Sequence, residues 1–493
     1  MELPHPLYSA DSVRDLDRRT IAALRIPSIT LMKRAGRAAF AQLLARWPEA
    51  SRVQVFCGGG NNGGDGYVIA ALAAEKQIPV TVYACVDPQK LSGDALEACR
   101  YAEREGVHIV TSLAELDSAD ANTVIVDALL GTGFSGAVRE HMAHAIERIN
   151  HSPAPVLAVD MPSGVESDSG AAGTAVQADI TVTFIGRKFG LFCGRGAALS
   201  GEVLFADLGA PGSVYREIDP LARRYDAASV PRLPRRPVDA YKNQFGHVLV
   251  VGGDRGFGGA AMMAAESAAR TGAGLVSLAT RPEHLPAALT RCPEVMARPV
   301  ISGQELEPLL EAPSVIAVGP GLGQEPWGEQ LLARAARAEV PVVLDADALN
   351  ILAGGRVLAG FRRDDWVLTP HVGEAARLLG CDTAEVLADP RGAALAIQQK
   401  FSGVVILKGA GTLIAHDGGV DLVNSGNPGM ASGGMGDLLT GVVAALVGQH
   451  MPLPKAAQLA VWLHGEAGNR AAADGQRGLL ATDLLPWVRK LVD

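Results

Sequence analysis

The 493-residue chain contains no uncharged apolar run of about 18 residues, the length at which a helix begins to span a membrane. Its first ten residues also lack the basic segment followed by an apolar stretch that marks a secretory signal peptide. We therefore expect neither a membrane partner nor export, and we predict a cytoplasmic protein.

Cysteine is scarce, and no two cysteines have the CxxC spacing of a zinc cage. This pattern argues against a cysteine-based zinc site and predicts reduced, buried thiols. The six cysteines are Cys57, Cys85, Cys99, Cys193, Cys292 and Cys381.

A sustained basic face is missing as well, and the formal net charge is −9 at pH 7. Proteins that bind nucleic acids or anionic membranes generally need a concentration of positive charge. We therefore expect small-molecule ligands and no nucleic acid. A homo-oligomer is expected.

What the chain does have is a globular composition, with 48% apolar and 20% charged residues. Its length exceeds that of one ordinary hydrophobic core, so two large domains are expected. Glycine is abundant, at 57 residues, and it is concentrated in short clusters after predicted strands. Such clusters favour nucleotide-binding loops over a flexible linker.

Short β-branched runs alternate with helical stretches in two successive sets. The near-continuous apolar character of these runs predicts parallel strands that are buried on both faces. In the first set the strands are 52–56, 80–84, 123–126, 156–159 and 180–184, with helices at 67–74 and 95–105. A long helical lead-in is predicted from Ser9 to Arg46, with Ser9 or Asp11 as its cap.

The second set follows a segment with three prolines between residues 230 and 237, which reads as a stiff linker. Its strands are 247–251, 275–279, 315–318, 342–344, 367–369, 404–407 and 412–415, and its final helices are 438–447 and 456–472. We predict an α/β protein with two three-layer αβα domains, at 1–225 and 241–493, joined by a linker at 226–240.

The first candidate site lies after the strand at 52–56. Asn61 and Asn62 stand between glycine runs, a pattern that exceeds what helix capping needs, although a capped strand-to-helix loop is the simpler alternative. The GxGxxG order of a dinucleotide fingerprint is absent. Asp127 and Asp160 stand at the tips of two later strands, where an aspartate is more often a cap or turn residue.

At one sheet edge, Asn62, Asp127 and Ser163 could supply hard oxygen ligands for K⁺, Mg²⁺ or Ca²⁺. Asp160 would then remain as an acid/base candidate.

These residues resemble the NAD(P)H-hydrate epimerase family, which interconverts the R and S forms of nicotinamide cofactors hydrated at C6. The resemblance implies a Rossmann-like domain and K⁺ held by Asn62, Asp127 and Ser163. It also implies substrate contacts from Asn61, Asn62, Gly63, Gly64, Asp65, Gly131, Thr132, Gly133, Phe134, Ser135, Gly136, Ala137 and Asp160. Gly59 departs from a proline that is common in the family.

The second candidate site centres on residues 427–437, which place four glycines and Asp437 ahead of an apolar helical pattern. Backbone N–H groups at a helix start can hold phosphate oxygens, and an aspartate there is within reach of the transferred group. The alternative is a flexible turn. Lys408 follows another predicted strand in a glycine-rich context suited to nucleotide phosphates, and His371 follows a third. A lone loop histidine usually has only structural partners.

This half resembles the ADP/ATP-dependent NAD(P)H-hydrate dehydratase family, which has a ribokinase-like fold. The resemblance implies substrate contacts from Ala260, Gly321, His371 and Asp437. It implies nucleotide contacts from Lys408, Gly409, Ala410, Gly411, Thr412 and Gly436. Val372 replaces a frequent proline.

Together the resemblances imply a bifunctional repair enzyme for NADH and NADPH hydrates (NADHX and NADPHX). Asp160 would be the acid/base of epimerisation, and Asp437 the general base of dehydration, with ADP as phosphoryl donor and Mg²⁺ as metal partner. Two alternatives stay open: a ribokinase-type small-molecule kinase with an accessory N-terminal domain, and a non-enzymatic nucleotide sensor.

Overall fold

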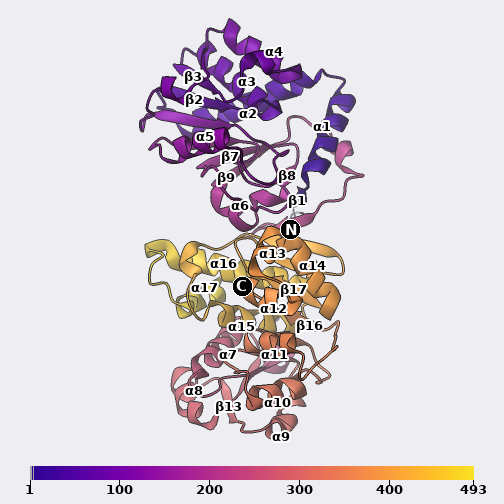
Figure 1. Cartoon of the computed structure of the whole chain (residues 1–493). Coiled ribbons are helices and arrows are strands. Elements are labelled where there is room, and N and C mark those ends of the chain that lie inside the picture. The colour runs from indigo at the N-terminus through magenta and orange to yellow at the C-terminus, as the bar shows by residue number, and fades with distance from the viewer. Residues whose placement is uncertain (1–2, 4) are drawn as a thin grey trace. The chain divides into compact units, whose positions relative to one another are not determined.

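The structure, a computed structural model, describes residue 3 and residues 5–493. Residues 1, 2 and 4, which belong to the predicted N-terminal domain, lie outside the described part. The chain forms two compact units, Pro6–Ala222 and Arg223–Asp493. Both combine sheets of mainly parallel strands with surrounding helices, which confirms the predicted α/β class (Figure 1).

The N-terminal unit contains a seven-stranded sheet in which every neighbouring pair is parallel. Its order is β4 (His108–Val110), β3 (Val80–Ala84), β2 (Arg52–Cys57), β5 (Thr123–Ala128), β6 (Val156–Val159), β7 (Ile180–Phe184) and β9 (Glu202–Ala206). Of these seven strands β2 comes first in the chain; β3 and β4 follow on one side of it, and β5, β6, β7 and β9 on the other. The crevice between the carboxyl ends of β2 and β5 is therefore the switch point, where open parallel sheets bind ligands.

Helices cover both faces of this sheet. Inward residues such as Val53 and Val55 share a core with α2 (Ser28–Arg46), α3 (Asn61–Glu75) and α4 (Gly93–Arg104). Phe56 and Ile125 point to the opposite face and pack with α5 (Glu140–Asn150). Because successive strand residues alternate between faces, a near-continuous apolar run supplies both cores.

The predicted lead-in helix is in fact two helices, α1 (Ala10–Leu24) and α2. Arg25 ends α1 in the left-handed conformation, with φ of 53°, and Pro27 precedes α2. Ser9 is confirmed as the cap, since its hydroxyl accepts a hydrogen bond from the Ser12 backbone N–H at 3.1 Å. Strands β4 and β9 and the short pair β1 (His5–Tyr8) and β8 (Arg187–Lys188) were not predicted.

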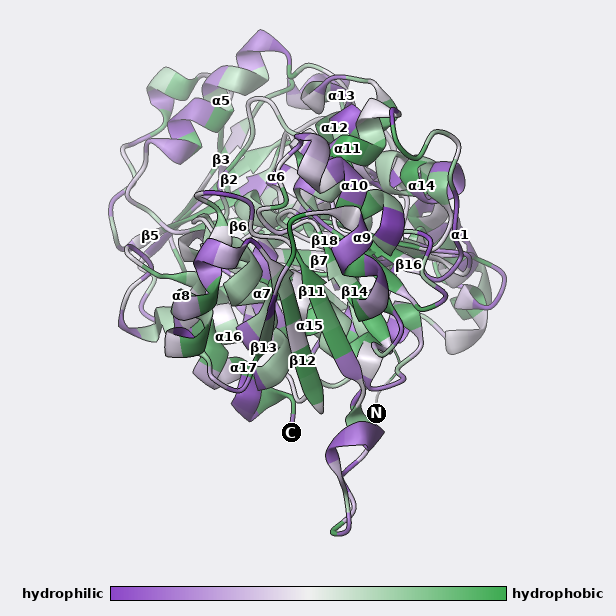
Figure 2. Cartoon of the chain, turned by 90° about the horizontal axis from the view of Figure 1, so that it is seen from below, coloured by the Kyte–Doolittle hydropathy of each residue, from purple (hydrophilic) through white to green (hydrophobic). Residues whose placement is uncertain are grey.

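The C-terminal unit repeats the pattern around β11 (His247–Val251), which lies between β12 (Leu275–Thr280) and β14 (Val315–Val318). All three are strongly apolar (Figure 2). The sheet continues in parallel from β12 to β13 (Met296–Pro299), and from β14 through β15 (Val342–Leu344) and β16 (Trp366–Leu368) to β17 (Val404–Leu407). Here the switch point lies between β11 and β14.

The prediction of wholly parallel sheets is wrong at the far edge of this unit. β18 (Thr412–His416) is antiparallel to both β17 and β19 (Gly419–Val423), because a tight turn at residues 408–411 leaves no room for a crossover helix. β10 (Ala222–Tyr225) then pairs with β19 in parallel.

Helices α7 (Gly258–Arg270), α15 (Met435–Gly448) and α16 (Leu453–Ala471) share one large core with the sheet, whereas α10 (Pro326–Ala335) and α14 (Pro390–Phe401) contact its strands separately. The other helices of this unit are α8 (Leu285–Arg291), α9 (Gly303–Leu306), α11 (Asp347–Gly354), α12 (Val372–Leu379), α13 (Thr383–Ala388) and α17 (Leu485–Leu491). The N-terminal unit also contains α6 (Gly194–Leu199).

The proline-rich segment packs against the C-terminal unit, and residues 226–240 belong to it. The Arg232 guanidinium stacks 4.3 Å from the centre of the Trp462 ring, and that of Arg236 lies 3.7 Å from the Phe245 ring. These cation–π contacts hold part of the segment expected to be a linker. The limits of the functional domains, at 225 and 241, stay predictions.

Two expectations drawn from composition, on membrane-spanning helices and on buried thiols, can be compared with the structure. Within the described residues, no helix is both long and apolar enough to cross a bilayer. All six cysteines are free thiols, but only Cys57, Cys99 and Cys193 are buried, so the expectation of uniformly buried thiols is wrong for Cys85, Cys292 and Cys381.

The closest helix packing in the C-terminal unit generates a stability prediction. A methyl group at Gly441 of α15 would lie 2.0 Å from the Ala264 carbonyl oxygen of α7. We expect Gly441→Ala to lower the free energy of unfolding of this unit by about 1–3 kcal/mol, as overpacking does. The control is Gly354→Ala in α11, where no atom lies within 4 Å. Urea titration of both variants should show a shift only for Gly441→Ala; equal midpoints would contradict the packing.

Candidate active sites

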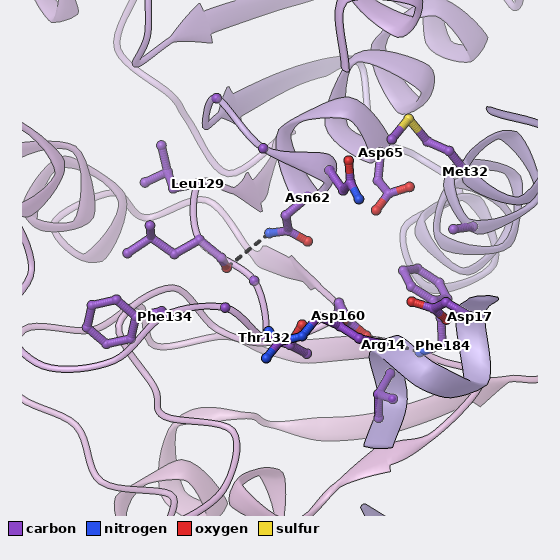
Figure 3. A pocket seen from close by; sticks show the side chains of 18 of the residues that line it. Arg14, Asp17, Met32, Asn62, Asp65, Leu129, Thr132, Phe134, Asp160 and Phe184 are labelled. Carbon is purple, nitrogen blue, oxygen red and sulfur yellow. Dashed lines mark hydrogen bonds between the residues drawn. The ribbon is translucent and has the colours of Figure 1, made fainter. Parts of the chain in front are cut away.

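A cavity of about 710 Å³ opens at the switch point of the N-terminal sheet. Three of the segments singled out in the sequence meet there: the start of α3 after β2, the loop after β5, and Asp160 after β6 (Figure 3). The predicted residues on its wall are Asn61, Asn62, Asp65, Gly131, Thr132, Gly133, Phe134, Ser135, Ala137 and Asp160.

Three predicted substrate residues are not on this wall. Helix α3 begins at Asn61, so Gly63 and Gly64 are buried inside its first turns and not in a loop before it. A methyl group on Gly63 would lie 2.0 Å from the Gly58 carbonyl oxygen, and one on Gly64 would lie 2.6 Å from the Met32 sulfur. Gly136 instead donates its N–H to Glu166 Oε1 at 2.9 Å. The two helix glycines thus allow close packing beneath the cavity.

The three predicted cation ligands converge. Asp127 is fully buried and accepts hydrogen bonds from the backbone N–H of Ser163 at 2.7 Å and from its hydroxyl at 2.5 Å. The Leu130 N–H donates to Ser163 Oγ at 2.8 Å, and its carbonyl accepts from Asn62 Nδ2 at 3.0 Å. The Leu130 backbone therefore links Asn62 to Ser163.

In this arrangement one polar atom lacks a hydrogen-bond partner, and one buried carboxyl group has hydrogen-bond donors but no cationic partner. Asn62 Oδ1 is buried and has no hydrogen-bond partner. Burial raises the pKa of Asp127 to about 6, although the hydrogen bonds from Ser163 and Leu129 oppose the shift. An orphaned amide oxygen and a desolvated carboxylate fit a hard cation. Among the described residues no three His, Cys, Asp or Glu side chains cluster as metal ligands, so neutral oxygens would have to complete the shell.

Asp160 is held by its neighbours in one orientation. Its backbone is left-handed, with φ of 67°, a conformation that costs free energy for a non-glycine residue and often occurs at functional sites. Its Oδ1 atom accepts from the Thr183 hydroxyl and the Phe184 N–H, both at 3.2 Å, and from the Lys188 ammonium. Among the residues that the structure describes, no donor binds Oδ2, and because Asp160 lines the cavity this oxygen is available to a ligand there.

Lys188 is fully buried, which is costly for an ammonium unless it is paired. Besides Asp160, it donates to Thr183 Oγ1 at 3.0 Å and to the Phe184 carbonyl at 3.1 Å. Its three N–H bonds therefore have three acceptors. Sequence reasoning missed this residue, although a lysine soon after an apolar strand is a recognisable signal.

Asp17 is the second missed residue of this cavity. It reaches the wall from α1, where helical periodicity puts it on the face of the buried Val13, Leu16 and Thr20 and sets it apart from Asp11 and Asp15. Only the packing of α1 places one of these three carboxylates in the cavity.

The second site is organised around Lys408, which directly follows β17. Its Nζ lies 2.8 Å from Asp345 Oδ1 and 3.9 Å from Glu374 Oε2. Asp345 is buried and also accepts from the hydroxyls of Thr369 and Thr440, both at 2.8 Å. Burial would raise the pKa of Asp345, but Lys408 and the two hydroxyls outweigh it and hold the pKa below its usual value. Sequence reasoning did not assign Asp345 or Thr440 to the site.

Asp437 lies in the first turn of α15, whose N-terminus has no side-chain cap. A methyl group on the adjacent Gly436 would lie 3.2 Å from Lys408 Nζ, so two predicted nucleotide-binding segments meet here. Burial, and then Asp345, raise the pKa of Asp437 to about 6, whereas Lys408 opposes the shift. The uncapped N–H groups leave the helix start open to an anion.

The other predicted residues lie at the same edge of the sheet. Gly321 has φ of 59°, and a methyl group there would lie 3.3 Å from Ala260 Cβ, so these two are neighbours at the switch point. Gly409, Ala410 and Gly411 form the turn between β17 and β18, where Thr412 Oγ1 donates to the Gly409 carbonyl at 3.2 Å.

His371 caps a helix, which is the structural role that the sequence analysis gave as the usual one for a lone loop histidine. Its Nδ1 accepts from the Gly373 N–H at 2.9 Å and the Glu374 N–H at 3.2 Å, and thereby caps α12. Burial and Lys408 lower its pKa. Nε2 lies 3.4 Å from Glu374 Oε1, and the side chain is about half exposed. A substrate contact by His371 stays a prediction, and only the Nε2 side is open to it.

Comparisons with known proteins agree with this division into two sites. Residues 248–489 match the family model described as NAD(P)H-hydrate dehydratase, and residues 28–190 match the model described as YjeF-related protein N-terminus. A bifunctional NAD(P)H-hydrate repair enzyme of Coxiella burnetii is 47% identical over 99% of both chains. The chain belongs to the family of bifunctional NAD(P)H-hydrate repair enzymes. The Escherichia coli enzyme of the same description is 40% identical over 100% of this chain and 95% of its own.

Two solved structures are similar to about half of the chain. A ribokinase-like superfamily protein of Enterococcus faecalis has 30% identity and a TM-score of 0.49 over 52% of this chain and 90% of its own. An ADP/ATP-dependent NAD(P)H-hydrate dehydratase of Bacillus subtilis, co-crystallised with ATP and Mg²⁺, has 28% identity and a TM-score of 0.47 over 53% and 93%. The family models and the full-length relatives confirm the family identified from sequence motifs.

The buried acceptor Asp345 provides a test of the second site. Thr440→Val keeps the side-chain shape but removes a donor to Asp345, and losing a hydrogen bond to a buried charge costs about 1–3 kcal/mol. We expect urea denaturation at pH 7 to show this loss in the C-terminal unit. Thr383→Val, at an exposed position, is the matched control and should leave the midpoint unchanged. Equal midpoints for the two variants would mean that Thr440 does not support Asp345.

Proposed function

We propose that this chain repairs hydrated nicotinamide cofactors by two reactions. The N-terminal site epimerises the R and S hydrates of NADH and NADPH, and the C-terminal site dehydrates the S form with a nucleotide as phosphoryl donor. The observation that carries the proposal is the open N-terminus of α15, which bears Asp437 and places the adjacent Gly436 against Lys408, in a chain that matches a bifunctional repair enzyme over 99% of its length.

In the C-terminal site, Asp437 accepts the proton of the C6 hydroxyl as that oxygen attacks the terminal phosphorus of the nucleotide. The N–H groups around Gly433 and Gly436 and the Lys408 ammonium stabilise the charge of the transferred phosphoryl group. The phosphorylated oxygen then leaves as phosphate, with electrons pushed from the ring nitrogen. Asp345 keeps Lys408 in place.

The nucleotide is bound by Lys408, Gly409, Ala410, Gly411, Thr412 and Gly436, and the hydrated cofactor by Ala260, Gly321, His371 and Asp437. Bound Mg²⁺ would neutralise phosphate charge during the transfer. We propose ADP as the donor on the basis of the bacterial members of the family; the Bacillus subtilis relative is described as ADP/ATP-dependent.

In the N-terminal site, Asp160 is the acid/base, because Lys188 and two further donors hold its Oδ1 and leave Oδ2 facing the cavity. The predicted substrate residues around it bind the hydrate. Asn62, Asp127 and Ser163 would hold K⁺, which would order the loops after β2 and β5. The fit rests on the orphaned Asn62 Oδ1 and the buried Asp127.

Family membership across the full chain favours this function over a small-molecule kinase with an accessory domain. The decisive assay supplies mixed R and S hydrates with ADP, Mg²⁺ and K⁺ and follows recovery of dihydropyridine absorbance. Full recovery requires both reactions, whereas recovery that stops at the S fraction would leave only the dehydratase. A phosphorylated alcohol that accumulates in stoichiometric amounts would instead identify a kinase.

Replacing the proposed general base tests the C-terminal mechanism. Asp437→Asn should lower the dehydration rate by about 10²–10⁴-fold, the usual contribution of a general base, and leave epimerisation unchanged. The base must be ionised, so the wild-type rate should fall as the pH drops through the Asp437 pKa of about 6. Asp364→Asn, an exposed carboxylate of the same unit, is the control. Retained dehydration by Asp437→Asn would refute the role.

The K⁺ site can be tested without catalysis. A ligand that binds only the folded state at about 100 times its Kd adds about 2.7 kcal/mol of stability. We expect KCl to raise the Tm of the N-terminal unit above that in tetramethylammonium chloride of equal ionic strength. Asn62→Leu and Asp127→Asn should abolish the difference. Asp117→Asn, at a carboxylate with 78% side-chain exposure, should preserve it. The same K⁺ shift in all three variants would rule out this ligand set.

A further inference from the structure

Four charged side chains gather at one part of the N-terminal cavity. Asp17 from α1, Asp65 from α3, Asp160 after β6 and Lys188 from β8 all line it. Figure 3 shows the three carboxylates around the same pocket. Only Asp160 is directly paired with the lysine. Three carboxylates and one ammonium cannot all be ionised cheaply in a largely desolvated site, so the cluster retains protons that a reaction can use.

Lys188 cannot supply such a proton readily, because its three N–H bonds already have the acceptors Asp160, Thr183 and Phe184. It therefore holds Asp160 in position at the cavity. Asp160 can accept a proton at Oδ2, but an epimerisation at C6 also needs a donor. A proton donor must come from another wall of the cavity.

Asp17 meets this requirement. Its carboxylate has no hydrogen-bond or ion-pair partner among the residues that the structure describes, although it is partly buried and lines the cavity. A desolvated carboxyl with no protein partner is a costly feature unless a ligand contacts it. We propose that Asp17 is a second catalytic residue of the epimerase site, acting as the proton donor that complements Asp160. This inference rests on the proposed epimerase function.

The two carboxyl groups have different electrostatic surroundings. The charged and titratable groups that face Asp17 are Arg14 on its own helix, Asp65, Asp160, Lys188 and Tyr215. Burial, and also the negative charge of Asp160, raise the pKa of Asp17 to about 6, and Lys188 opposes the shift. A group that titrates near neutrality can both give and take a proton.

Asp65 is less suited to the role. Burial, and then the charges of Asp160 and Asp17, hold its pKa well above the usual range. Loss of its proton is therefore disfavoured, and its side chain is better suited to donating a hydrogen bond to a ligand.

The reaction balances with these two residues alone. The C6–O bond breaks and its electron pair leaves with the oxygen, which takes the Asp17 proton and departs as water. The lone pair of the ring nitrogen forms a C=N bond to C6. Water then attacks C6 from the other face, the new C–O bond forms, and Asp160 accepts the released proton. Proton exchange with solvent restores both carboxyl groups, and the roles exchange in the reverse direction.

The test follows one pure epimer to the equilibrium mixture, using the full chain without nucleotide, with an enzyme-free control. We expect Asp17→Asn to lower kcat by about 10²–10⁴-fold with little change in KM, as loss of a general acid does. Asp17→Glu should recover part of the rate. Asp11→Asn, an exposed carboxylate on the same helix, should behave as wild type.

The pH profile separates this role from a structural one. The wild-type kcat should fall on the alkaline side of the Asp17 pKa of about 6, because Asp17 must be protonated to act as the donor. Asp17→Asn should lose this alkaline limb. A native rate in Asp17→Asn, or a wild-type profile without an alkaline limb, would overturn the assignment. The second result does not require the variant to fold. If the wild type does not interconvert the epimers, the proposed function itself fails.

Discussion

In each unit a lysine ammonium pairs with an aspartate at the tip of a parallel strand. Lys188 binds Asp160 after β6, and Lys408 binds Asp345 after β15. Both carboxylates sit where strand ends converge, and the ammonium beside each offsets part of the cost of burying it. Hydroxyl donors complete each pair, joined at Asp160 by the Phe184 N–H, so each carboxylate is held in place. The remaining site residues are arranged around these two fixed charges.

Each pair leaves other carboxylates less compensated. Asp437 shares the field of Lys408 with Asp345, and Asp17 shares that of Lys188 with Asp160. Because burial disfavours the charged form and one ammonium cannot neutralise several carboxylates, the pKa of the less compensated group rises toward neutrality. That is the range in which a side chain exchanges protons efficiently at physiological pH. One electrostatic arrangement therefore supports proton transfer in both halves of the chain.

Much of the fold followed from the sequence, because apolar runs buried on both faces carry a strong local pattern. Strands β3, β6, β7, β11 and β14 lie where the pattern placed them. The edge strands β4, β9 and β13 were missed, since they are short and contribute few core residues. Glycine-rich motifs also located the sites. Their local pattern did not show that Gly63 and Gly64 serve helix packing, because the steric limit comes from Gly58 and Met32.

The sequence alone determined the family, the two-domain α/β architecture, the strand tips that carry Asp127, Asp160 and Lys408, and the helix start that carries Asp437. These features depend on local order along the chain, which motifs and periodicity record directly. Only the tertiary structure decided which charges share a cavity. It brought Asp17 from α1 and Lys188 from β8 to Asp160, and placed Thr440 against Asp345. Such contacts join residues far apart in the chain, and their energies depend on burial, which no local pattern encodes.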